Sequence, residues 1–211
     1  MGQAKNKRLH QEASTQQLQQ PVSAVSHALR RLTLAASSNL GSDCYLLAIL
    51  GQKLLADQGI QAQIHAGYSS WRVGGGDGDV IAHIPNVPAY KPEDVASTAY
   101  HAWLVLPESD LLLDLTTYQL PVKGQKLDAM DGGKTSVDWA PDFLLAPLAS
   151  IKTHSEVARA AGPVAYNYQA VPGLLTLLES GSSLDEGDLA VARLLVANPV
   201  MEVVGPNSGL S

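Results

Sequence analysis

Three residues in this chain have side chains that together can supply a nucleophile and its proton-transfer partners: Cys44, His101 and Asp114. Cys44 is the only cysteine. The other two occur in the stretch HAWLVLPESDLLLDLTT (101–117), where two short apolar runs flank a Pro-Glu-Ser-Asp turn. An imidazole and a carboxylate in such runs are costly to bury unless they are paired. The sequence therefore predicts a hairpin in which the histidine and the aspartate meet.

The register of this hairpin decides whether the two side chains share a face. A turn centred on Glu108 and Ser109 places Trp103 opposite Asp114, which makes Asp114 the diagonal neighbour of His101. A slip of one residue would move the carboxylate to the other face. In the predicted register Asp114 accepts a hydrogen bond from one ring nitrogen and leaves the other nitrogen free to take or give a proton.

The nucleophile is expected at the start of a buried helix, predicted to be capped by Ser42 and to end at Gly59, a left-handed terminator. Cys44 lies in its first turn, where the positive end of the backbone dipole favours a thiolate. The Cys44 backbone N–H is a candidate oxyanion donor, and Asn39, Ser38 or Ser42 is the candidate second donor.

The remaining pattern predicts a helix over 21–37, strands over 60–74 and 79–85 joined by GGGDGD, and helices near 172–180 and 184–197. The stretch KGQKLDAMDGGKTS (123–136) is interpreted as loop. This order predicts an α+β fold with an antiparallel sheet packed on the buried helix. Residues 1–20 are expected to form a flexible polar tail, and 21–211 a single domain with a C-terminal helical extension.

The chain resembles the transglutaminase-like superfamily, relatives of the papain-type cysteine peptidases. The resemblance covers roughly residues 40–118 and includes LLADQGIQAQIHAGY (54–68), HAW (101–103) and the Cys-His-Asp order. It implies a papain-like, transglutaminase-like core.

In roles taken from that family, Cys44 is the nucleophile, His101 the general base and acid, and Asp114 the orienting carboxylate. The implied function is a thiol-dependent hydrolase or acyltransferase acting on an amide, ester or thioester carbonyl. Members also include inactive versions, so the alternative is a catalytically silent module that binds a protein partner. Unlike the larger transglutaminases, the chain is expected to have no flanking β-domains, and Asp77 and Asp79 are too few for a calcium site.

Structural interpretations stay open for the same residues. Cys44 can be a small buried apolar residue, His101 a core histidine bonded to a backbone carbonyl, and Asp114 a turn cap or a partner of Arg72. A metal site from the cysteine and the histidines at 65, 83 and 101 lacks zinc-type spacing, so no metal and no cofactor is expected. The candidate cleft-lining residues are the aromatic ones near the proposed site: Trp103, Trp71 and Tyr45.

Composition restricts partner and compartment. No stretch approaches the roughly 20 apolar residues of a membrane span, and the polar N-terminus is not a secretory signal. The cytoplasm is therefore the expected compartment, and a lone cysteine agrees with it. Net charge is −6, with five basic residues against one acidic residue in 1–31. The acidic remainder argues against a nucleic-acid surface. The expected partner is a protein, peptide or small-molecule acyl substrate that the sequence does not name.

Overall fold

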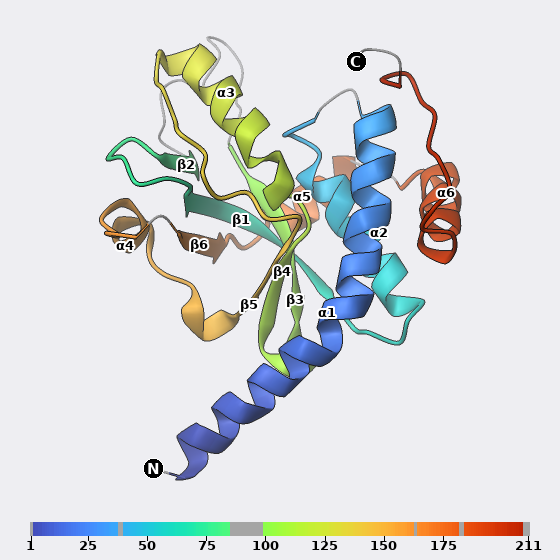
Figure 1. Cartoon of the computed structure of the whole chain (residues 1–211), viewed down its shortest axis with the longest axis horizontal. Helices are drawn as coiled ribbons and strands as arrows, with labels where there is room; N and C mark the ends of the chain where they lie inside the picture. Colours follow the sequence, from blue (N-terminus) through green and yellow to red (C-terminus); the bar gives the residue numbers. More distant parts are fainter. Residues whose placement is uncertain (1, 38–39, 85–98, 163, 182–183, 209–211) are drawn as a thin grey trace.

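The computed structural model of the chain describes residues 2–37, 40–84, 99–162, 164–181 and 184–208, with side chains from residue 12 onward. The fold is α+β: a curled antiparallel sheet with helices packed against it (Figure 1). The predicted fold class is confirmed at this level.

The sheet is centred on the longest strand, β1. Its strands are β1 (Gln63–Arg72), β2 (Val80–His83), β3 (His101–Leu106), β4 (Leu111–Asp114), β5 (Leu144–Pro147) and β6 (Ala165–Ala170). They pair in the order β2-β1-β3-β4-β5, and β6 pairs with β1. Gly67 pairs with both His101 of β3 and Ala170 of β6, so these two strands lie on opposite edges of β1.

The hairpin β3–β4 has the predicted register. Leu106 pairs with Leu111 and Leu104 with Leu113, which is the alignment that follows from a turn centred on Glu108 and Ser109. The turn itself is a 3-10 helix, Pro107–Ser109, that ends at Asp110 in the left-handed conformation with φ 53°. The register prediction is confirmed.

The α-helices are α1 (Gly2–Ala36), α2 (Cys44–Ala56), α3 (Leu120–Asp131), α4 (His154–Ala158), α5 (Leu174–Gly181) and α6 (Glu186–Ala197). Further 3-10 turns cover Thr117–Gln119 and Leu148–Ser150. Helices α1, α2 and α6 contact one another, and α2 also contacts β3 and β1. They lie together on one side of the sheet, whereas α3 and α4 lie toward the other side (Figure 1). The two C-terminal helices were predicted.

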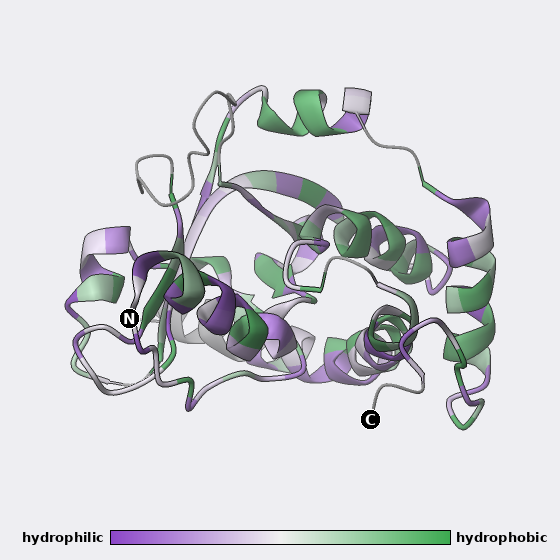
Figure 2. Ribbon diagram, turned by 90° about the horizontal axis from the view of Figure 1, so that it is seen from above, coloured by the Kyte–Doolittle hydropathy of each residue, from purple (hydrophilic) through white to green (hydrophobic). Residues whose placement is uncertain are grey.

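Helix α1 begins much earlier than the predicted start at Pro21, because its helical backbone includes residues 2–20. That segment is rich in Gln, Ala, Lys and Leu, which have high helix propensity. From Pro21 onward, buried side chains such as Val22, Val25 and Leu29 recur at helical spacing. Hydrophilic and hydrophobic residues alternate along this helix in Figure 2.

Helix α2 begins at the predicted residue, Cys44, but its N-cap is Asp43 and not Ser42. The Asp43 side chain makes no capping hydrogen bond within the helix; it accepts a hydrogen bond from Ser37 instead, at 3.0 Å. At the other end Gly59 has φ 76°, and Ile60 N–H donates to the Leu55 carbonyl at 2.9 Å. The left-handed terminator is confirmed.

The interpretation of 123–136 as loop is wrong in its first part, because α3 runs from Leu120 to Asp131. Its start is favoured by Pro121 in the first turn, and its end by Gly132 in the left-handed conformation with φ 77°. The helix has little hydrophobic periodicity, so its signals are at its ends. This difference matters because α3 carries Lys123.

The core consists of two hydrophobic clusters. One lies between α1, α2, α6 and one face of the β3–β4 hairpin, and it includes Cys44 and Ala102. The other lies on the opposite face and includes Trp71, Trp103 and Tyr168. Cys44 and its expected partner His101 therefore meet only where the start of α2 reaches the start of β3.

Candidate active site

His101 and Asp114 form a fully buried pair across the hairpin. The Nε2 atom of His101 lies 2.8 Å from Oδ2 of Asp114, and both side chains are 0% exposed. The contact follows from the diagonal relation that the register predicts. Two of the structural alternatives fail on geometry: the histidine bonds a carboxylate and not a backbone carbonyl, and the side chain of Arg72 donates to the carbonyls of Gly76, Val157 and Ala158.

The Asp114 carboxylate is fixed by three further hydrogen bonds. Its Oδ1 accepts from Thr116 N–H and from the Thr116 hydroxyl, each at 2.8 Å. Its Oδ2 also accepts from the Tyr168 hydroxyl at 2.7 Å, and that hydroxyl in turn accepts from Trp71 Nε1 at 2.7 Å. Asp114 thus caps a local turn, as one alternative supposed, and also holds the imidazole. A carboxylate with this many donors is rigid and stays ionised.

The Cys44 thiol lies near the same imidazole. Asp114 is hydrogen-bonded to Nε2 of His101. The other ring nitrogen, Nδ1, is buried and has no hydrogen-bond partner among the described residues. The thiol is close enough to the ring for the side-chain interaction to affect the titration of both groups. The backbone N–H of Ala102 lies near enough to the Cys44 sulfur to lower the pKa of the thiol. The ring is therefore hydrogen-bonded to the acid through Nε2 and interacts with the thiol electrostatically.

The electrostatics favour a charged thiol–imidazole pair. Burial raises the pKa of Cys44, but the His101 ring, the Lys123 charge and the Ala102 N–H together bring this pKa below its ordinary value. Burial lowers the pKa of His101, and the Asp114 carboxylate outweighs burial and raises it. Burial likewise raises the pKa of Asp114, yet His101 and Lys123 hold it well below its usual range. Each shift has the direction that a thiolate–imidazolium pair needs.

Aromatic rings enclose the imidazole. Trp71 approaches it edge to face at 4.8 Å between centroids, Trp103 stacks at 6.3 Å, and Tyr168 lies at 5.9 Å. These rings exclude water and fix the plane of His101. The prediction that Trp103 packs beside the imidazole is confirmed. Trp71, offered as either cleft or core, is core at 0% exposure.

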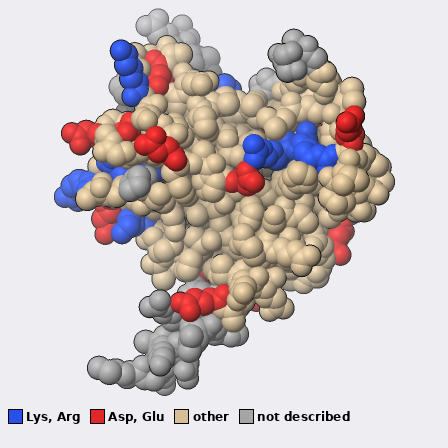
Figure 3. Space-filling view, in the orientation of Figure 1, with Lys and Arg blue, Asp and Glu red and all other residues tan. Residues whose placement is uncertain are grey.

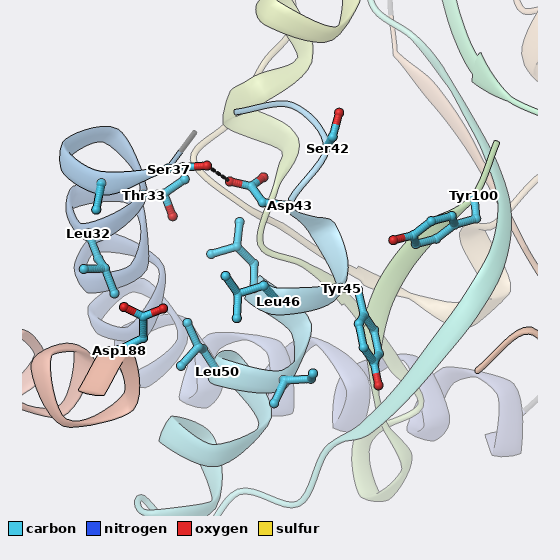
Figure 4. A pocket seen from close by; sticks show the side chains of 13 residues that line it. Leu32, Thr33, Ser37, Ser42, Asp43, Tyr45, Leu46, Leu50, Tyr100 and Asp188 are labelled. Carbon is cyan, nitrogen blue, oxygen red and sulfur yellow. Dashed lines mark hydrogen bonds between the residues drawn. The ribbon is translucent and has the colours of Figure 1, made fainter. Parts of the chain in front are cut away.

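The site is closed, and an open pocket adjoins it. Cys44 is 5% exposed and borders a narrow void shared with Ala48, Ala102 and Thr116. The neighbouring pocket has a volume of about 440 Å³, and its lining includes Tyr45 and Tyr100, which directly follow and precede the two reactive residues in sequence. Figure 4 shows both tyrosines on one wall, opposite α1.

The walls of this pocket combine leucine side chains with hydroxyl and carboxylate groups. Asp43 and Asp188 both line it, the second from α6. Figure 4 shows Asp43 hydrogen-bonded to Ser37 at the top of the pocket and Asp188 beside Leu50 at its base. Among the candidate cleft-lining residues, Tyr45 lines this pocket, whereas Trp71 and Trp103 do not.

The candidate oxyanion donors have separate outcomes. Ser38 and Asn39 lie outside the described residues. Ser42 is exposed and lines the pocket, with its hydroxyl pointing away from Tyr45 in Figure 4. Sequence reasoning missed the Ala102 backbone N–H, which lowers the pKa of the Cys44 thiol.

Sequence reasoning also missed three side chains that hold the site: Thr116, Tyr168 and Lys123. Thr116 follows Asp114 by two residues, and a serine or threonine at that spacing is a recognisable turn partner of an aspartate. Tyr168 comes from β6, a strand that was not predicted. Lys123 comes from α3, and its ammonium lies 3.5 Å from Thr116 Oγ1 and 5.0 Å from the centre of the Trp71 ring.

The described residues contain no group of three or more His, Cys, Asp or Glu side chains placed to hold a metal ion. His65 and His83 instead pack against aromatic rings, at 6.0 Å from Trp103 and 5.6 Å from Trp71. On the face in Figure 3, basic side chains lie in separate groups among acidic ones. None of the helices in the described part of the chain has the length and apolarity that a membrane crossing requires.

Comparisons with known proteins give a fold likeness and no family. No family model matches the sequence, and no curated protein matches it. The fold is similar to the crystal structure of a structural-genomics target whose name states no activity, with a TM-score of 0.57 and 13% identity over 88% of this chain and 83% of that chain. At this identity the likeness concerns the fold alone.

Proposed function

We propose that this chain is a thiol-dependent hydrolase or acyltransferase with a papain-like, transglutaminase-type core. The observation that carries the proposal is the buried hydrogen bond of His101 Nε2 to Asp114, beside a Cys44 thiol whose pKa the same imidazole lowers. A lone buried cysteine needs no such arrangement. A nucleophile–base–acid series is the minimum that covalent acyl chemistry requires.

The chemistry follows from these positions. The Cys44 thiolate attacks the carbonyl carbon of an amide, ester or thioester, forming a C–S bond and placing the carbonyl electron pair on oxygen. As that pair returns, the bond to the leaving group breaks and His101 Nδ1–H protonates the leaving group. Water or an amine then attacks the thioester while His101 accepts its proton, and Cys44 leaves as thiolate. Asp114 keeps Nε2–H in place and stabilises the imidazolium.

Alkylation of Cys44 tests the proposal cleanly, because the chain has one cysteine. The rate with iodoacetamide is measured from pH 5 to pH 10, and its pH midpoint is compared with the ordinary thiol value of about 8.5. We expect a midpoint well below that value, and His101→Ala should return it to the ordinary range. His154→Ala is the matched control, since this histidine hydrogen-bonds Ser70 at 3.0 Å outside the site. A midpoint near 8.5 in the unmodified protein rejects the enzymatic function.

The burial of the site favours a second candidate, a catalytically silent fold that binds a partner. Cys44, His101 and Asp114 are all buried, and the open volume lies beside them and not above the sulfur. In that case the same triad serves as a rigid buried network, and the pocket holds the partner. A Cys44→Ser variant with undiminished biological effect would support this candidate over the first.

A further inference from the structure

Lys123 places a positive charge inside the protein next to the candidate active site. Its side chain is 3% exposed, and its described contacts are the hydroxyl of Thr116 at 3.5 Å and the face of Trp71 at 5.0 Å. An ammonium is expensive to bury without a compensating negative charge. The Thr116 hydroxyl donates to Asp114, so the compensating carboxylate belongs to the candidate triad.

We propose that Lys123 is a positioning residue of the thiol site, whose fixed charge balances Asp114 and sets the pH range in which the Cys44–His101 pair is reactive. The inference rests on the proposed function, because this pH range concerns activity only if Cys44 and His101 carry out the proposed reaction. It does not follow from the Cys-His-Asp series, because such a series contains no cation apart from the imidazolium.

The titratable groups that face Lys123 come from four different elements. They are Cys44 at the start of α2, His83 on β2, His101 on β3 and Asp114 on β4. With Asp114 ionised and the thiol and imidazole both neutral, the cation brings the buried group to zero net charge. Proton transfer from thiol to imidazole keeps that sum. Both states of the pair are therefore compatible with a site closed to water.

The cation acts in opposite senses on the two reactive groups. It stabilises a thiolate and opposes an imidazolium, so it lowers the pKa of Cys44 and also that of His101. Removing the charge should therefore raise both pKa values. A purely structural role predicts something different: loss of packing lowers stability but has no reason to move two titrations in the same direction.

Three variants separate charge from packing. Lys123→Met keeps most of the side-chain volume without the charge, and Lys123→Arg keeps the charge. Lys126→Met is the matched control, because it removes an exposed lysine of the same helix that bonds the Leu40 carbonyl. Lys123→Gln replaces Lys123→Met if that variant does not fold, because it retains a donor for Thr116. Urea unfolding establishes that each variant is folded before it is titrated.

Two titrations are measured: the pH dependence of Cys44 alkylation, and the NMR titration of the His101 ring, identified by its loss in His101→Ala. For Lys123→Met we expect both midpoints to rise by roughly 0.5–1 pH unit, with those of Lys123→Arg and Lys126→Met close to the parent values. Unmoved or lowered midpoints in folded Lys123→Met, or an equal rise in Lys126→Met, would overturn the inference. Failure of the proposed function is distinguishable, since it appears as an ordinary thiol midpoint in the parent protein.

Discussion

Replacing Asp114 by asparagine is the sharpest single test of the buried network. The carboxylate accepts four hydrogen bonds, from His101 Nε2, the Tyr168 hydroxyl and the two Thr116 donors. An asparagine side chain has one acceptor oxygen and presents an NH₂ group in place of the other. If its oxygen keeps the Thr116 donors, its NH₂ faces two former donors. His101 must then accept at Nε2, which moves its proton to Nδ1 and leaves no base beside Cys44.

The cost in stability can be worked from these contacts. A hydrogen bond to a charged group contributes about 1.5–3 kcal/mol, and removing one partner of a buried ion pair costs about 3–5 kcal/mol. Both effects concern the same buried carboxylate, so they are not added. We expect Asp114→Asn to lower the free energy of unfolding by about 3–5 kcal/mol.

The pH dependence of this difference has a definite shape. The pKa of Asp114 is lowered in the native state, so its contribution is complete above the unfolded value of about 3.9 and is lost as pH falls through the native value. The pKa of His101 is raised, so its contribution is complete below about 6.5 and is lost as pH rises through the native value. The difference between parent and variant should therefore be largest between about pH 4 and pH 6.5.

Urea unfolding from pH 3 to pH 9 measures the difference directly. Asp57→Asn is the matched control, because Asp57 pairs with Arg193 at 2.7 Å with both side chains more than two-fifths exposed; that pair should contribute about 1 kcal/mol or less. An Asp114→Asn protein within about 1 kcal/mol of the parent, or a difference that does not vary with pH, would refute the electrostatic account of the site.

Two further substitutions test the supports of the site. Tyr168→Phe removes a donor from Asp114 and leaves Trp71 Nε1–H without its acceptor. Thermal or urea unfolding should therefore show that this variant loses about 2–4 kcal/mol of stability. The control is Tyr166→Phe, which removes a hydroxyl that contacts Ser150 in a partly buried position and should cost about 1 kcal/mol. Gly67→Ala places a methyl group 1.9 Å from a backbone oxygen of β6 and should cost about 3 kcal/mol or more, whereas Gly75→Ala meets no atom within 4 Å. Equal losses within either pair would contradict the reasoning.

The part of the site that the sequence predicts is the part encoded locally. The β3–β4 register depends on a tight turn between two short apolar runs, and these fix the relation of His101 to Asp114 within 14 residues. The helix carrying Cys44 has a clear apolar start and a glycine end. Both patterns are local in the sequence, so they can be recognised without knowledge of the tertiary structure.

The missed part comes from segments whose placement is a tertiary outcome. Tyr168 lies on β6, more than 50 residues from its partner Asp114, and the short run AYNYQA does not specify which strand it joins. Lys123 lies on a helix with weak amphipathic character, and nothing local distinguishes it from an exposed lysine. Buried polar groups that pair over such distances become visible only when the fold brings them together.

Access of substrate to the sulfur follows from the same geometry. Covalent attack needs a carbonyl carbon about 3–3.5 Å from the thiolate, and the void beside Cys44 is too narrow to hold a substrate group. Two residues that line the adjoining pocket, Tyr45 and Tyr100, are the immediate sequence neighbours of Cys44 and His101. Burial raises the pKa of Tyr100 to about 12, so this wall stays uncharged at neutral pH and adds no negative charge against the thiolate. Under the proposed chemistry, a path from this pocket to the thiol must therefore open before a carbonyl carbon can reach the sulfur.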